Sequence, residues 1–119
     1  MKHFLILLCL LIVLLSGSMT AQTPAFRWAK SAGGASDEIG QSIAVDASGN
    51  SYVTGYFQSA TVAFGGTTLT NAGGYDIFVV KYDAAGTVLW ARRAGGTSSE
   101  FGISIAVDAS GNSYVTGHY

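Results

Sequence analysis

Cysteine, proline and charged residues are all scarce in this chain of 119 residues. A single cysteine excludes a disulfide framework within the chain. Charged residues make up 11 % of the sequence and the formal net charge is −1, whereas globular proteins have roughly 25 % charged residues. Nucleic acids and anionic membranes select a basic surface, so neither is an expected partner. Because 49 % of the residues are hydrophobic, the scarcity of charge does not indicate disorder.

Glycine, in contrast, occurs 16 times, and short β-rich runs alternate with glycine-rich turns. No segment after residue 21 keeps a helical period, so we predict an all-β protein. The expected strands cover residues 26–29, 42–45, 51–57, 61–64, 67–70, 77–82 and 87–91. The pattern Asp-x-x-Gly, at Asp46, Asp83 and Asp108, is typical of hairpin turns, because Asp accepts backbone hydrogen bonds and Gly adopts the left-handed conformation.

Residues 1–21 have the pattern of a secretory signal peptide. Lys2 precedes an unbroken apolar run over residues 4–15, which is shorter than the roughly 20 residues of a membrane-spanning helix. A small and polar stretch follows, so we predict cleavage after Ala21, with cleavage after Ser18 as the alternative. Cys9 would be removed with the peptide. We therefore expect an exported protein, secreted or at the cell surface, with no membrane span after cleavage.

The mature region, residues 22–119, repeats itself with a period of 62 residues. Residues 28–57 align with residues 90–119 without a gap, and 22 of the 30 positions are identical. The region therefore holds one complete unit, residues 28–89, and a partial unit, residues 90–119, or about 1.6 units.

One unit is predicted to be an antiparallel meander of four or five strands. Such a meander cannot bury both faces alone, and radial stacking of copies as the blades of a β-propeller solves this problem. A unit of 62 residues exceeds the roughly 40–50 residues of common blades, so we expect one long hairpin arm over residues 62–70. A linear β-solenoid is the alternative architecture.

Three strings of the chain resemble the SBBP repeats of secreted bacterial proteins, which are named for a seven-bladed β-propeller. They are SIAVDASGNSYVTGYF, FGGTTLTNAGGYDIFVVKYDAAGTVLWAR and AGGTSSEFGISIAVDASGNSYVTG. The resemblance covers nearly all of residues 26–119. It implies a propeller fold in long exported proteins with a surface or extracellular role, and it supplies no catalytic residues. Even four blades of this length need about 248 residues, so we expect further blades beyond Tyr119 in a longer protein.

Calcium binding is the first chemical interpretation to weigh. Asp46, Ser48 and Asn50 have the spacing of the first ligands of a calcium loop. Such a loop also needs Gly at position six and Glu at position twelve, and Ser51 and Phe57 stand there. A hairpin turn explains the same residues, so we predict no metal and no cofactor.

Catalytic residues are also not expected in this stretch. Glu38 and Glu100 occupy the same position in the two units, which favours a role in a turn or a blade junction over a unique acid–base site. His118 is the only histidine after residue 21, and no Gly-x-Ser-x-Gly motif occurs. The sequence therefore predicts a protein that is not an enzyme.

The aromatic residues divide into two groups. Those that recur in both units are expected in the core, and they are Trp28, Trp90, Tyr52 and Tyr114. Those that differ between units are candidates for a recognition surface, and they are Tyr56, Phe57, His118 and Tyr119. Arg92 and Arg93 are interpreted as charged gatekeepers on a strand.

The leading hypothesis is an exported, non-enzymatic β-propeller repeat segment that acts as a structural or binding scaffold at the cell surface or outside the cell. One alternative is a carbohydrate-binding propeller, and another is the non-catalytic part of a larger secreted enzyme. The sequence does not distinguish a protein partner from a polysaccharide.

Overall fold

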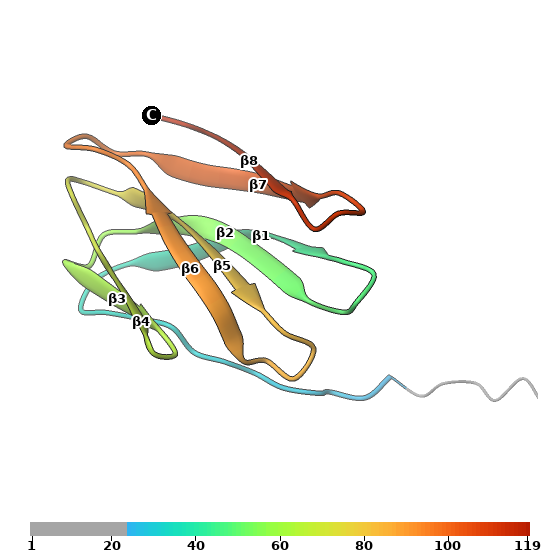
Figure 1. Ribbon diagram of the computed structural model, residues 1–119. Helices are drawn as coiled ribbons and strands as arrows, with labels where there is room; N and C mark the ends of the chain where they lie inside the picture. Colours follow the sequence, from blue (N-terminus) through green and yellow to red (C-terminus); the bar gives the residue numbers. More distant parts are fainter. Residues whose placement is uncertain (1–23) are drawn as a thin grey trace, which may run out of the picture.

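The computed structural model describes residues 24–119, which form eight antiparallel β-strands and no helix (Figure 1). The strands are β1 (Glu38–Val45), β2 (Ser51–Phe57), β3 (Thr61–Phe64), β4 (Thr67–Thr70), β5 (Asp76–Tyr82), β6 (Val88–Ala94), β7 (Phe101–Val107) and β8 (Ser113–His118). The all-β prediction is confirmed. The predicted signal peptide, residues 1–21, lies outside the described residues. Within them no helix is long and apolar enough to cross a membrane.

The first four-stranded sheet is a complete blade with the order β1-β2-β5-β6. Consecutive strands pair antiparallel, and β2 and β5 align from Ser51↔Tyr82 to Phe57↔Asp76 without a register shift. The hairpin β3–β4 is inserted between β2 and β5 and forms its own two-stranded sheet. This hairpin is the predicted arm, and it begins one residue earlier than expected, at Thr61.

The hairpin β7–β8 repeats β1–β2 and lies beside it in space (Figure 1). A register shift between Gly40 and Ser42 in β1 recurs between Gly102 and Ser104 in β7. The sequence repeat is thus also a repeat of backbone geometry, bulge included, and the two β-hairpins pack against each other.

The boundary of the first blade in the structure differs from the boundary of the repeat unit that was counted in the sequence. The period was counted from Trp28 and Trp90, but Trp90 lies in β6, the last strand of the first blade. A strand over residues 26–29 was predicted and is wrong, since between residue 24 and β1 the only pairing is an isolated bridge between Gly33 and Ala63. Residues 28–32 correspond to β6, and the described residues contain no second β5 with which they could pair.

Three of the hairpin turns have one geometry, and their glycines explain it. In the turn after β1, the N–H of Gly49 donates to the Asp46 carbonyl at 3.0 Å, and Asp46 and Asn50 close the turn. Gly49, Gly86 and Gly111 have φ values of 81°, 83° and 80°, a region that only glycine enters readily. The prediction that Asp-x-x-Gly marks hairpin turns is confirmed at all three sites.

The core lies between the sheet and the hairpin arm. Phe78, Val80 and Tyr82 of β5 alternate with half-buried residues, as expected for a strand with one covered face. They pack with residues of the arm and of β2 and β6, namely Phe57, Val62, Phe64, Leu69 and Ala91. We call this side of the blade the hairpin face. The opposite side, on which β7 lies, is called the junction face.

Candidate functional site

In two of the three Asp turns, those of Asp46 and Asp108, both carboxylate oxygens accept hydrogen bonds from the protein's own donors. Asp46 Oδ1 accepts the backbone N–H groups of Ser48 and Asn50, each at 2.9 Å, and Oδ2 accepts the Asn50 amide at 2.8 Å and the Tyr52 hydroxyl at 3.2 Å. Asp108 repeats this network. Hydrogen-bond donors face these oxygens where a cation's ligand sphere would need free lone pairs. The interpretation as a turn is confirmed. Within residues 24–119 no three His, Asp or Glu side chains gather at one point.

These hydrogen bonds favour the charged carboxylates. The side-chain amide of Asn50 lowers the pKa of Asp46 below its ordinary value of 3.8, and Asn112 does the same for the pKa of Asp108. The backbone N–H of Thr87 lowers the pKa of Asp83. A carboxyl group whose pKa is lower in the folded state stabilises that state above its unfolded pKa, and this contribution is lost as the pH falls through the folded pKa.

Acid is therefore expected to loosen the turns. We expect the urea midpoint of unfolding to stay level above the unfolded Asp pKa of about 3.9 and to fall below it. A triple variant, Asp46→Asn, Asp83→Asn and Asp108→Asn, should have a lower midpoint at neutral pH and a flatter acid dependence. An acid dependence equal to that of the original protein would contradict a role of these three carboxylates.

The recurring glutamates hold the loops before the inner strands. Glu38 Oε2 accepts the N–H of Gly34 at 3.0 Å, and Glu100 Oε2 accepts the N–H of Gly96 at the same distance. Both glutamates thus close the same five-residue loop, one in each unit. The prediction that they serve a turn or a blade junction is confirmed.

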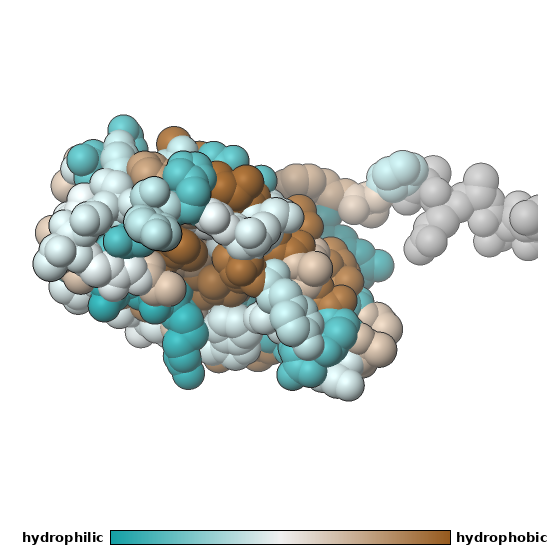
Figure 2. All heavy atoms as spheres, turned by 90° about the horizontal axis from the view of Figure 1, so that it is seen from above, coloured by the Kyte–Doolittle hydropathy of each residue, from teal (hydrophilic) through white to brown (hydrophobic). Residues whose placement is uncertain are grey.

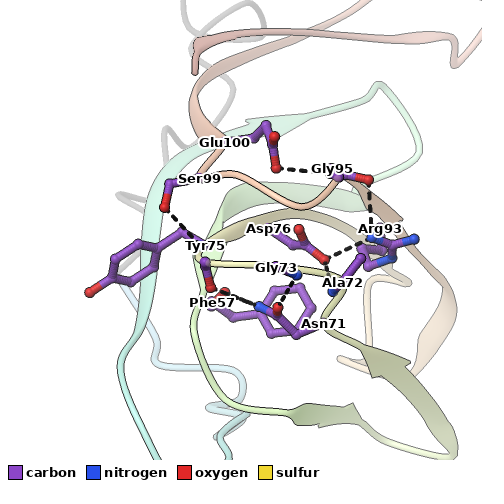
Figure 3. Close-up of polar contacts among 12 residues, drawn as sticks. Phe57, Asn71, Ala72, Gly73, Tyr75, Asp76, Arg93, Gly95, Ser99 and Glu100 are labelled. Atoms are coloured by element: carbon purple, nitrogen blue, oxygen red, sulfur yellow. Dashed lines mark hydrogen bonds and ion pairs between the residues drawn. The ribbon is translucent and has the colours of Figure 1, made fainter.

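A polar cluster around Asp76 ties the ends of several strands together (Figure 3). Asp76 at the start of β5 is fully buried. Its Oδ2 accepts the Ala72 N–H at 2.7 Å and an Arg93 N–H at 2.8 Å. Arg93 also donates to the Gly95 carbonyl at 3.1 Å. Arg93 was interpreted as a surface gatekeeper, and it is instead the ionic partner of a buried carboxylate. The matching position in the first unit is Ser31, so the repeat carried no signal for this pair.

Hydrogen bonds join the two loops next to this cluster, the one before β5 and the one before β7. The Gly74 N–H donates to the Ser98 carbonyl at 2.8 Å, and the Glu100 N–H donates to the Tyr75 carbonyl at 2.7 Å. The Ser99 hydroxyl accepts the Tyr75 N–H at 3.2 Å. The glycine-rich segment before β5 is therefore part of the connection between the first blade and β7.

A cluster of four rings lies where β2, β7 and β8 meet the loop before β5. Tyr56 packs edge to face on Tyr75 and on Phe101, with centroids 5.4 and 4.8 Å apart, and Phe101 stacks on His118 at 5.0 Å. In Figure 3 the Tyr75 ring points away from the Asp76 cluster. We call Tyr56, Tyr75, Phe101 and His118 the ring cluster.

The structure divides the four predicted recognition residues. Tyr56 and His118 belong to the ring cluster. Phe57 was also expected on an exposed surface, and this is wrong: its ring is fully buried in the core, because alternation along β2 turns it to the hairpin face. Tyr119 is 99 % exposed. Tyr75 was not predicted, because residues 72–75 have no counterpart among residues 90–119 with which they could be compared.

Of the recurring aromatic residues, Trp28 and Trp90 are both half-buried, whereas the two tyrosines differ in burial although they share a repeat position. Tyr52 is fully buried, as predicted, and packs edge to face on Trp90 at 6.1 Å. Trp28 is half-buried against Tyr82, with centroids 5.4 Å apart. Tyr114 is 60 % exposed, so its prediction as core is wrong for the described residues. Trp90 packs on Tyr52, and within residues 24–119 no tryptophan packs on Tyr114 in the same way.

The antiparallel four-stranded blade is stacked on the hairpin of the second repeat unit, and turn and junction residues join the two. This arrangement defines the chain as a β-propeller repeat protein. The β-propeller repeat family SBBP matches residues 27–56 and 89–118. The chain belongs to this family.

A search of curated proteins adds a more distant relative. The chain is 30 % identical over 112 residues to an uncharacterized WD repeat-containing protein of Acanthamoeba polyphaga mimivirus. The match covers 80 % of this chain and 8 % of the viral protein, so the chain corresponds to a small part of that relative's length. No solved structure matches the chain.

Proposed function

We propose that this chain is an exported, non-catalytic β-propeller repeat segment that acts as a structural or binding scaffold at the cell surface or outside the cell. The observation that supports the proposal is that the acidic residues shared by both units accept hydrogen bonds from main-chain N–H groups of their own turns and loops. Asp46 and Asp108 close turns, and Glu38 and Glu100 close loops. A catalytic centre needs a unique constellation of groups, whereas a residue used in the same way in successive blades supports the blade.

Export is the part of the proposal that rests on residues 1–21. Their apolar run and the small residues that follow are the pattern of a cleaved secretory signal. The low charge and the glycine-rich turns of residues 22–119 agree with a rigid extracellular repeat. Further blades in a longer protein would complete the propeller ring.

Fractionation of cells that make the full chain with a C-terminal epitope tag tests the export. We expect the tagged protein in the medium or on the outer surface, sensitive to added protease, and shortened by about 2 kDa as expected for a removed signal peptide of 15–30 residues. The control is the double variant Leu7→Arg and Leu8→Arg, which interrupts the apolar run and should keep the protein inside at full length. Full-length protein inside the cell without these substitutions would contradict the proposal.

Carbohydrate binding is a second candidate function, and the ring cluster favours it. Tyr56, Tyr75 and Phe101 are half-buried and His118 is exposed, so parts of several rings face solvent within one small area. Aromatic rings that are apolar on one side and wet on the other are suited to sugar stacking. In a polysaccharide pull-down, Tyr75→Ala should reduce binding, and Tyr119→Ala, outside the cluster, should not. Binding that Tyr75→Ala leaves unchanged would exclude the ring cluster as the site.

A further inference from the structure

The contact between the first blade and β7–β8 depends on a few close approaches. The backbone N–H of Ile105 donates to Ser42 Oγ at 3.3 Å. Gly102 lies so close to the blade that a Cβ at this position would stand 2.7 Å from Thr54 Oγ1 and 2.9 Å from the Gly55 carbonyl oxygen. This contact buries the Ile105 side chain, which is only 7 % exposed.

Each side of this contact is present a second time in the chain. The residues that approach the blade, Gly102 and Ile105, recur as Gly40 and Ile43 of β1. The residues that receive them recur as Ser104, Thr116 and Gly117 of β7 and β8. All five are identical in type to their counterparts, so the chain carries an approaching surface and a receiving surface that its own contact does not use.

The second approaching surface is open. Ile43 is 62 % exposed, whereas Ile105 at the same repeat position is nearly buried. The sheet around Ile43 is nevertheless complete, because β1 belongs to the four-stranded blade. A cavity of about 310 Å³ lies beside Ile43 and Val53 on the hairpin face, lined mainly by apolar residues. Glu38 lines this cavity too, and its Oε1 is buried without a hydrogen-bond partner.

The second receiving surface is also uncovered. Ser104, Thr116 and Gly117 are exposed in the described residues. Figure 2 shows the molecule from the side of β7 and β8, and apolar side chains are exposed in the middle of this side, between hydrophilic ends. Ile103 in β7, at 41 % exposed, is one of the large apolar residues that this hairpin leaves open to solvent.

We propose that these two surfaces bind each other between copies of the chain, so that β1–β2 of one copy docks on β7–β8 of a second copy, head to tail. The occupant is a second copy because it presents the residues that the approaching surface already recognises within one chain. In the docked pair, Gly40 takes the place of Gly102 against Thr116 and Gly117 of the second copy. The contact is heterologous, so a docked pair still presents one free surface of each kind and the assembly can grow into a ring or a stack.

Gly40→Ala is the variant that separates docking from folding. A Cβ at Gly40 would meet only Val53 Cγ1, at 3.8 Å, within the chain. In the docked pair the same Cβ would meet the Thr116 hydroxyl and the Gly117 carbonyl. We therefore expect Gly40→Ala to melt like the original protein but to self-associate at least about tenfold more weakly, because overpacking an interface is costly. Gly66→Ala is the control, since its Cβ would meet nothing within 4 Å.

Sedimentation velocity over a range of concentrations measures the self-association of the full chain. Mixing Gly40→Ala with Thr116→Trp tests the direction of docking, because each variant keeps the surface that the other has lost. We expect the mixture to form pairs at concentrations at which each variant alone is monomeric. A monomeric original protein at every concentration, as expected if only further blades of a longer chain cover these surfaces, would overturn the proposal. So would undiminished association of Gly40→Ala.

Discussion

Gly95→Ala is expected to destabilise the folded chain by about 3 kcal/mol, through backbone strain and overpacking together. Gly95 has a φ of 152°, a conformation that residues with a side chain rarely adopt. Its Cβ would also collide with Asp76 Oδ1 and stand 2.7 Å from Glu100 Oε2. These close contacts could be relieved only if Asp76 moved, but Asp76 is buried and binds Arg93 at 2.8 Å. The substitution therefore disturbs the polar cluster that connects the blade to β7.

Gly33→Ala is the matched control, because Gly33 is the same residue of the same motif in the first unit. Its Cβ would have one neighbour, Glu38 Oε2, at an ordinary 3.7 Å, and its φ is not in the left-handed region. We expect a change within about 0.5 kcal/mol, the usual range for a surface substitution. Urea unfolding of both variants at one protein concentration measures the difference. Equal losses at the two glycines would show that the loop sequence, rather than the contact with Asp76, decides their stability.

The difference between these two glycines illustrates what the sequence could predict. The sequence predicted most features that lie within one unit: the meander strands other than residues 26–29, the Asp-x-x-Gly turns, the hairpin arm and the loop-closing glutamates. These features depend on local hydrogen bonds and on alternation along a strand, both of which are visible in the order of the residues.

Contacts between units could not be predicted in the same way. Asp76 and Arg93 form an ion pair across β5 and β6 in which Asp76 is fully buried. Asp76 has no counterpart among residues 90–119, and the position of Arg93 holds Ser31 in the first unit. Tyr114 shows the opposite failure. Its identity with Tyr52 predicted a core residue, and its 60 % exposure reflects the absence of a covering strand beside β8 among the described residues. Identical residues in two units predict the same local structure, whereas their burial also depends on which strands lie beside them.

The candidate recognition residues were chosen because they differ between the two units. Variation between units singled out position 56 and its counterpart at 118, and the structure places both side chains in the ring cluster. It also singled out Phe57, which varies for another reason: Phe57 faces the hairpin arm, and the described residues beyond His118 include no such arm. Variation alone therefore does not distinguish an exposed surface from a core that only one unit has.

Phe57→Ala is expected to cost about 3–5 kcal/mol of stability, the usual loss when a buried phenylalanine leaves a cavity. The Phe57 ring has no exposed surface and packs in the cluster of the arm and β5. The main chain beside it is also fixed, because the Asn71 amide donates to the Phe57 carbonyl at 3.0 Å. The neighbours therefore cannot easily move to fill the space. We expect a variant that unfolds at a much lower urea concentration, with arm residues exchanging amide protons faster.

Tyr119→Ala provides the comparison, because Tyr119 holds the same repeat position and is 99 % exposed. It should change the urea midpoint very little, since a side chain that is already in water loses no burial. The two variants thus compare a buried and an exposed aromatic residue at the same repeat position of one molecule. A large loss from Tyr119→Ala would mean that its ring is buried in solution, and docking on a second copy would be the first explanation to examine. The test is to repeat the measurement in the Gly40→Ala background. There, docking predicts that the loss from Tyr119→Ala disappears, whereas the loss from Phe57→Ala persists, because the Phe57 ring is covered by its own blade.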